Sequence, residues 1–322
     1  MDHSSNVRTA ISISDVKVSL QRFGLPGVFI ALCIFLTATS DSFLTVSNFF
    51  NVARQVSLIG IIGVGMFFVL VGGGIDISVG SLVALIGVVM AGLVVKSHLS
   101  VLLAVGLSLL LAATLGFINA YFVTKWRIPP FIVTLGMMSA ARGFAFVYTN
   151  GYAVFGLPEG FKELGRGYIG SVPIPVIIML AIVLLAHFAA TKTKFGRFVY
   201  AIGGNEEAAR LSGINVAFYR GATYVLCSML AGVSGIILTS RLASGQPNSG
   251  VGYEFEAITA AVLGGTSLFG GEGTIWGVIF GALFMGVLGN GLNLLNVSSY
   301  WQLVIKGAVL VVAVLIDMLK KR

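Results

Sequence analysis

The sequence has too few charged residues to cover a water-soluble fold. Only 10% of its 322 residues are charged, whereas 57% are hydrophobic and the mean hydropathy is +0.99. Soluble proteins carry about 25% charged residues, which surround the apolar core. Most of the chain is therefore expected to lie in lipid, where a spanning helix needs about 20 mostly apolar residues.

Residues that build metal and catalytic sites are also scarce. The three histidines, His3, His98 and His187, lie far apart, and Cys33 and Cys227 fall inside apolar runs, where buried free thiols are expected. The sequence contains no HExxH, G-x-S-x-G or GxxxxGK[ST] pattern. It therefore predicts no metal, no cofactor and no catalytic site, and it provides no loop for ATP phosphates.

Apolar runs recur along the chain at the length of membrane spans. They cover residues 24–40, 55–72, 79–95, 101–123, 131–148, 173–190, 221–240, 255–267, 274–293 and 300–317. We predict an all-α integral membrane protein of about ten transmembrane helices, in which the short run at 255–267 is either a tilted span or a re-entrant one. Residues 1–23 are predicted to form an N-terminal tail, and residues 24–322 a single polytopic domain.

The Lys and Arg residues predict the orientation in the membrane. If the N-terminus is inside, the inner segments hold most of the 20 Lys and Arg residues, as is usual for cytoplasmic loops. Both termini are therefore predicted to be cytoplasmic. The same rule accounts for the net charge of +8 without nucleic-acid binding. The longest outer loop is 149–172, and the inner loop 191–220 is the most charged stretch.

The inner loop 191–220 is predicted to contain a short helix with signals at both ends. Gly203 and Gly204 are expected to break the chain, and Asn205 is a favourable N-cap residue. Gly213 is a plausible C-terminal stop. A helix of about two turns is marginal alone in water, so packing on the same chain or on a partner must hold it.

The residues within this short helix fit a docking element. Glu206 and Glu207 lie in its first turn, where the helix dipole favours anions, and Glu206 can pair with Arg210 one turn later. The small side chains of Ala208 and Ala209 would suit a groove on a partner. An ordinary amphipathic surface helix is the alternative.

Five segments of the sequence carry a family resemblance. The segment from Gly203 to Ile214 resembles the cytoplasmic coupling segment of bacterial ABC permeases for ribose, xylose and arabinose. Further matching stretches, in the same order along nearly the whole chain, are Gly74–Ser81, Ser244–Pro247 with Gly252–Glu254, Val262–Leu268 with Gly270–Gly271, and Asn290–Leu295. Any one motif is weak, whereas together they are specific.

The resemblance implies an architecture and partners. Two permease copies would pair with two cytoplasmic ATPase subunits, and a periplasmic sugar-binding protein would deliver the substrate. The fold would be similar to the vitamin B12 permease class, with both termini cytoplasmic. The short helix would dock in a groove of the ATPase. The coupling residues would be Asn205, Glu206, Glu207, Ala208, Ala209, Arg210 and Gly213.

Asp76 is an ionisable residue at a break between two apolar runs. Gly72, Gly73 and Gly74 are expected to unwind the chain before it, which frees backbone groups that need partners. Broken helices often line substrate sites in transporters. The alternative, which span counting favours, is that Asp76 caps a helix at the cytoplasmic edge of the membrane.

Other polar residues lie within the apolar runs. Arg142 and Lys306 can both snorkel, and Arg142, which is the deeper of the two, is the better candidate for a buried pair. Asn119, Asn290 and Asn293 either face the translocation pathway or form hydrogen bonds between helices. No arrangement of these residues identifies a sugar site.

The function that follows from these features is monosaccharide import by alternating access. ATP binding on a partner chain and the loaded binding protein would each favour one state of the permease pair. A ribose-type pentose is the expected substrate by resemblance, with a hexose or a furanosyl signal molecule as alternatives. A secondary transporter independent of an ATPase is a further alternative, although such proteins often place acidic residues deep in their spans.

Overall fold

The described part of the protein consists almost entirely of helices. The computed structural model describes the backbone of residues 13–320 and the side chains of residues 25–318. Each predicted apolar run contains a helix. These helices are α1 (Ile13–Thr39), α2 (Val46–Val71), α3 (Val79–Val95), α4 (Val101–Thr124), α5 (Pro130–Thr149), α7 (Ile174–Lys192), α10 (Val216–Leu242), α11 (Tyr253–Leu263), α12 (Ile275–Leu294) and α13 (Ser299–Lys320). Residues 1–12 of the predicted tail lie outside the described residues, and residues 13–23 belong to α1.

The helices differ in their ability to span a bilayer. Within the described part of the chain, seven helices are long and apolar enough to cross a membrane, namely α2, α4, α5, α7, α10, α12 and α13. The apolar part of α1, Leu25–Thr39, and α3 are shorter. With 11 residues, α11 is roughly 16 Å long, about half the thickness of the hydrocarbon core. The helix within the run at 255–267 is therefore too short to cross a bilayer.

The core of the bundle is built around α2, α3 and α10. The helix α10 packs against both α2 and α3, and α4, α5, α11 and α12 surround these three helices. A helix that is apolar on all sides is expected to be buried, and the apolar window of α2 is 89% buried. Glycines allow the close approach of α11 and α12, because a Cβ atom on Gly277 or Gly281 would collide with the backbone of Gly264 or Ala260.

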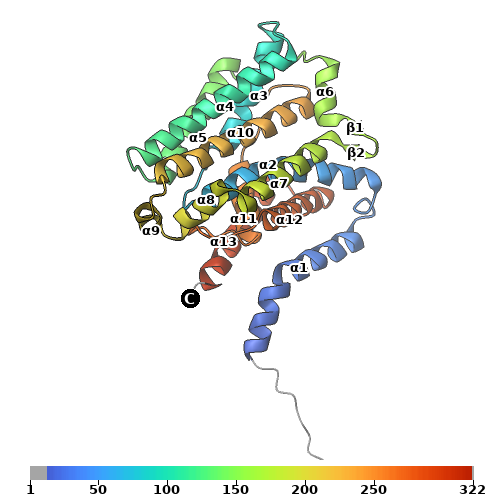
Figure 1. Ribbon diagram of the computed structural model, residues 1–322. Helices are drawn as coiled ribbons and strands as arrows, with labels where there is room; N and C mark the ends of the chain where they lie inside the picture. The colour runs from blue at the N-terminus through green and yellow to red at the C-terminus, as the bar shows by residue number, and fades with distance from the viewer. Residues whose placement is uncertain (1–12, 321–322) are drawn as a thin grey trace, which may run out of the picture.

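Short elements mark the two ends of the bundle. The helix α6 (Glu159–Arg166) and the hairpin of β1 (Tyr168–Ile169) and β2 (Val172–Pro173) lie at one end, which we call the α6 end. The helices α8 (Lys194–Gly204) and α9 (Glu206–Leu211) lie at the other, the α9 end, near the last turns of α13 (Figure 1). The sequence therefore places its most charged loop at a single end of the bundle.

Candidate functional site

The predicted capped helix is α9. Asn205 is its N-cap, and the side-chain oxygen of Asn205 accepts a hydrogen bond from the backbone N–H of Ala208 at 2.9 Å. Gly213 follows the helix with a φ of +80°, a conformation that favours glycine. Both capping predictions are confirmed. The expected break at Gly203 and Gly204 is wrong: they are the last residues of α8, and the extended backbone of Asn205 ends that helix.

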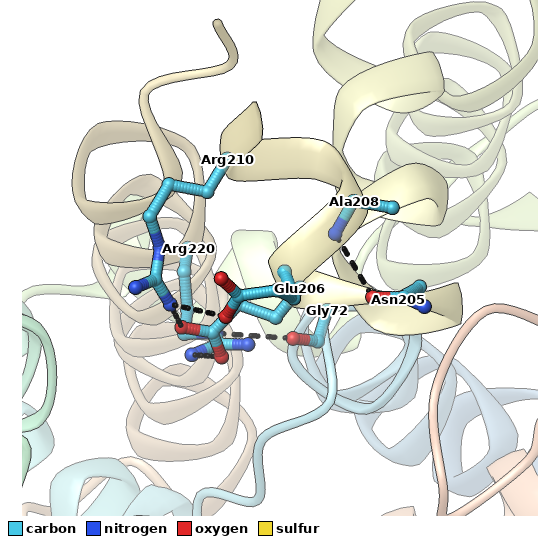
Figure 2. Close-up of polar contacts among 7 residues, drawn as sticks. Gly72, Asn205, Glu206, Ala208, Arg210 and Arg220 are labelled. Atoms are coloured by element: carbon cyan, nitrogen blue, oxygen red, sulfur yellow. Dashed lines mark hydrogen bonds and ion pairs between the residues drawn. The ribbon is translucent and has the colours of Figure 1, made fainter. Parts of the chain in front are cut away.

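Glu206 joins α9 to two other helices (Figure 2). Its carboxylate contacts the Arg210 guanidinium at 3.0 Å, which confirms the predicted pair, and the Arg220 guanidinium at 2.8 Å. Nε of Arg220 in turn donates a hydrogen bond to the carbonyl of Gly72 at 3.2 Å. Gly72 is the residue that ends α2. A chain of three polar contacts therefore runs from α9 through the start of α10 to the end of α2.

The two arginines determine the charge state of Glu206. Partial burial works against its carboxylate, but hydrogen bonds and charge from Arg220 and Arg210 outweigh burial and hold the pKa of Glu206 below its usual range. Glu206 is therefore ionised at neutral pH. In the sequence, Arg220 is one of several basic residues of the inner loop 191–220, and its place just before an apolar run is the one signal that could mark it as a helix-start contact.

One face of α9 is exposed, and the opposite face is buried against the rest of the chain. Glu207 is 71% exposed and lies 3.8 Å from Arg210, and Ala208 is also exposed. Leu211 is 81% exposed, which is unusual for an apolar side chain on a helix in water. Ala209 is buried against its own chain. The expected Ala–Ala face is therefore wrong, because successive residues on a helix point in different directions.

Hydrogen bonds fix α8 and its surroundings at the α9 end. The backbone N–H of Gly271 donates to the carbonyl of Val71 at 2.9 Å, and the Tyr200 hydroxyl donates to the carbonyl of Gly273 at 2.7 Å. These bonds connect the end of α2, the helix α8 and the loop that precedes α12. The support beneath α9 is therefore built from three separate parts of the sequence.

Asp76 is buried within the bundle. The glycines unwind the chain as predicted, since α2 ends at Val71 and Gly73 has a φ of +75°. Asp76 is completely buried, and one of its oxygens accepts hydrogen bonds from the backbone N–H and the hydroxyl of Ser78. The N-cap position of α3 belongs to Ser78. The capping interpretation of Asp76 is therefore wrong, because its side chain bonds the two-residue turn before the helix.

Arg142 on α5 holds a loop that enters the bundle. Its guanidinium donates hydrogen bonds to the carbonyls of Pro247 at 2.8 Å and Ser249 at 2.7 Å, and to that of Gly80 in the first turn of α3 at 3.3 Å. Pro247 and Ser249 belong to the segment between α10 and α11. Arg142 thus bonds mainly to backbone carbonyls and not to the buried acidic partner that its depth suggested.

The remaining polar candidates connect pairs of helices. Asn290 on α12 and Asn48 on α2 exchange two hydrogen bonds of 2.7 and 3.0 Å between their amides. Asn293 accepts a hydrogen bond from Gln302 on α13 at 2.8 Å. Lys306 on α13 forms an ion pair with Glu256 on α11.

Asn119 belongs to the surroundings of Asp76. Its amide, on α4, donates to the Ser78 hydroxyl at 3.2 Å. The structure brings Asp76 and Asn119 together, but it places Arg142, Asn290 and Asn293 in separate parts of the bundle. The polar candidates therefore do not form one site.

Comparisons with known proteins agree with this arrangement. Residues 48–314 match the family described as "Branched-chain amino acid transport system / permease component". The chain is 47% identical over 292 residues to the ribose import permease protein RbsC of Escherichia coli K12, covering 89% of this chain and 91% of that protein. No solved structure matches the chain.

Two further relatives are permeases for ribose and for a second pentose. The ribose import permease protein of Bacillus subtilis 168 is 47% identical over 293 residues, covering 90% of each chain. The L-arabinose ABC transporter permease protein of Azospirillum brasilense is 40% identical over 302 residues, covering 94% of this chain and 89% of that protein. The protein belongs to the permease components of bacterial ABC sugar importers, and it is a multi-pass transport subunit of the inner membrane and not an enzyme.

Proposed function

We propose that this permease imports a ribose-type pentose. The support is the 47% identity, over most of the chain, to two proteins that are named ribose import permeases. A periplasmic binding protein would deliver the sugar to the permease, and a separate ATPase subunit would drive its release inside. A hexose is the second candidate, because the chain is 37% identical to a D-allose transport permease of Escherichia coli K12.

The α9 end is the cytoplasmic end in this proposal. The basic residues of the chain are concentrated in the loops of that end, and the last turns of α13 lie there as well (Figure 1). The proposal retains about ten membrane helices per chain, similar to the vitamin B12 permease class, with α1 and α3 as short spans and α11 as a partial one. Both termini are then cytoplasmic.

The helix α9 is the proposed coupling helix. Its exposed residues Glu207, Ala208 and Leu211 would enter a groove of the ATPase, with Arg210 at the edge of the contact. Asn205 and Gly213 fix the two ends of α9, and Ala209 packs it on the permease. The observation that carries the proposal is the contact chain of Figure 2, because it leads from this exposed face to the end of α2.

A second copy of the chain is proposed to cover α5. Gly136 and Gly143 lie on an exposed face of α5, and nothing else in the described part of the chain comes within 4 Å of a Cβ atom built on either glycine. Small residues allow helices in membranes to approach closely.

The remaining polar candidates are proposed to hold the elements of each copy in position and not to bind sugar. They are Asn119, Arg142, Asn290 and Asn293.

The proposed function is tested by reconstitution in liposomes with the ATPase and the binding protein. Ribose, L-arabinose and D-allose are compared as substrates, and the Glu207→Arg variant is compared with wild type. Ribose uptake that needs ATP and is lost in the variant supports the proposal. Uptake without the ATPase would contradict the proposal. A preference for D-allose would show that the substrate is a hexose and not a pentose.

A matched control separates docking from folding. Glu159 is 88% exposed on α6, at the opposite end of the bundle, and its pairing with Lys162 resembles that of Glu207 with Arg210. Binding of the ATPase to the purified permease is measured for Glu207→Arg and Glu159→Arg. Only the first variant is expected to lose the ATPase.

A further inference from the structure

The connection between α2 and α3 carries a carboxyl group that lacks a charged partner. Asp76 has no exposed surface, and Ser78 supplies both hydrogen bonds to its Oδ1 atom. Its second oxygen, Oδ2, is buried and has no hydrogen-bond partner. Among the described residues, Asp76 forms no ion pair. An unpaired carboxylate in such surroundings is strongly destabilised relative to the neutral acid.

Two side chains near Asp76 also have buried oxygen atoms without a hydrogen-bond partner. Oδ1 of Asn119 and the hydroxyl of Tyr224 are both buried without a partner. The Asn119 amide adjoins the Asp76 carboxyl and also bonds Ser78, while the Tyr224 hydroxyl packs against Gly74. Oδ1 of Asn119 can only accept a hydrogen bond. A proton on Oδ2 of Asp76 would provide a donor among these unpartnered oxygens, and Oδ1 of Asn119 is able to accept it.

The groups around Asp76 do not supply a compensating positive charge. From α10, Tyr224 and Cys227 face it, and neither a phenol nor a thiol can carry a positive charge. Arg220 lies near Tyr224, but its guanidinium is engaged by Glu206 and by the carbonyl of Gly72. The side chains that contact Asp76 from α4 and from the start of α3 are the uncharged Asn119 and Ser78.

We propose that Asp76 is a proton-binding site of the permease, in which its Oδ2–H group donates a hydrogen bond to Oδ1 of Asn119. The reaction is a simple acid–base equilibrium, in which the carboxylate takes one proton from water and becomes a neutral carboxylic acid. The closed bundle keeps this proton. If the α2–α3 connection opens to water during transport, the acid can ionise, so the site links proton binding to the conformation of this connection.

The first test measures thermal unfolding of the purified full-length permease in lipid nanodiscs from mildly acidic to mildly alkaline buffer. The neutral acid stabilises the folded chain, so the wild-type midpoint is expected to fall by several degrees as pH rises. Asp76→Asn keeps the neutral shape and a donor toward Asn119. Its midpoint is expected to be at least as high as that of wild type in mildly acidic buffer and to show no such fall, because stability from a raised pKa is fully present only below the unfolded pKa. The control Glu163→Gln, on the exposed surface of α6, should behave like wild type.

Three results would overturn the proposal. The first is a wild-type midpoint independent of pH combined with an Asp76→Asn variant that is less stable at every pH, because this pattern indicates a permanent carboxylate. The second is failure of Asp76→Asn to fold. The third is a wild-type midpoint that rises with sodium concentration at constant pH, because a cation then takes the place of the proton.

A second measurement uses the wild-type protein alone. The infrared spectrum should contain the C=O band of a protonated, hydrogen-bonded carboxyl group at neutral pH, where exposed carboxylates do not absorb. The band should be retained in Tyr224→Phe, which removes a hydroxyl without a partner, and should shift in Asn119→Ala, which removes the acceptor. Absence of the band at neutral pH would contradict the proposal independently of any variant.

Discussion

A guanidinium nitrogen of Arg220 lies 2.8 Å from a carboxylate oxygen of Glu206, and the same side chain donates through Nε to the carbonyl of Gly72. Glu206 is in the first turn of α9, whereas Gly72 ends α2 at the start of the unwound connection. Arg220 is 17% exposed and therefore partly shielded from water. This residue gives α9 a rigid connection to the transmembrane core.

Replacing Arg220 with Gln is expected to uncouple ATP hydrolysis from sugar uptake. Loss of a hydrogen bond to a charged group costs about 1.5–3 kcal/mol, which corresponds to roughly a tenfold or greater change in an equilibrium. The ratio of sugar imported to ATP hydrolysed, measured in liposomes, should fall by about that factor. Binding of the ATPase should be retained, since Arg220 lies behind the exposed face of α9.

The matched variant for this prediction is Arg210→Gln. Arg210 also pairs with Glu206, but it is 45% exposed, and its ion pairs join it only to Glu206 and Glu207 of the same helix within the described part of the chain. An exposed pair contributes only about 0–1 kcal/mol, so the uptake ratio should change little. Equal losses in the two variants would show that the connection to Gly72 is unimportant.

The pH dependence of the α9 contacts follows from the charge state of Glu206. Its pKa is lower in the folded protein than in the unfolded chain, so the stabilisation is present above the unfolded pKa and is lost as pH falls through the folded pKa. The stability difference between wild type and Glu206→Gln should stay constant from neutral pH down to about pH 5.5 and disappear only in stronger acid. Loss of this difference near neutral pH, measured by thermal unfolding, would contradict the assignment.

Local rules were sufficient to predict α9 from the sequence. Asn205, Glu206 and Gly213 act through hydrogen bonds and charges within a few residues, so their order in the chain determines their roles. The apolar runs located the membrane helices for a similar reason, because span length is a property of one segment. The unwound stretch at 72–74 was also predicted correctly from its three consecutive glycines.

Contacts between distant segments of the chain could not be predicted from the sequence. The bond between Arg220 and Gly72 joins residues 148 positions apart, so the position of Arg220 just before an apolar run could mark it as a helix-start residue but could not identify Gly72 as its partner. Span counting favoured Asp76 as a helix cap, because it gives the order of the loops but not the side-chain contacts within them. The contact of Arg142 with the carbonyl of Pro247 likewise joins residues 105 positions apart.

The amide pair of Asn48 and Asn290 should stabilise the contact between α2 and α12. Both side chains are buried, so replacing only one by Leu leaves the other amide unsatisfied, at a cost of about 1–3 kcal/mol. Replacing both removes the polar groups together and should restore much of the lost stability. A double-mutant cycle of thermal unfolding in nanodiscs measures this coupling. Additive effects of the two substitutions would exclude a direct interaction.

A second copy of the chain should contact α5 near Gly143. The side chain of a Gly143→Cys variant would lie on the exposed face of α5, and in a symmetric pair it would meet the same residue of the other copy. In a background without Cys33, a short bifunctional maleimide is expected to join two copies in membranes. Cys227 can remain, because it is buried.

The control for cross-linking is Ala181→Cys on α7. Ala181 is exposed like Gly143, but α7 packs against α2 and α12, whereas α5 packs against α3 and α4. The two sites are therefore on different sides of the bundle and at similar distances from its α6 end. Cross-linking at Gly143→Cys alone supports pairing through α5. Equal cross-linking at both sites would indicate random collisions in the membrane, and dimers from Ala181→Cys alone would place the second copy against α7 instead.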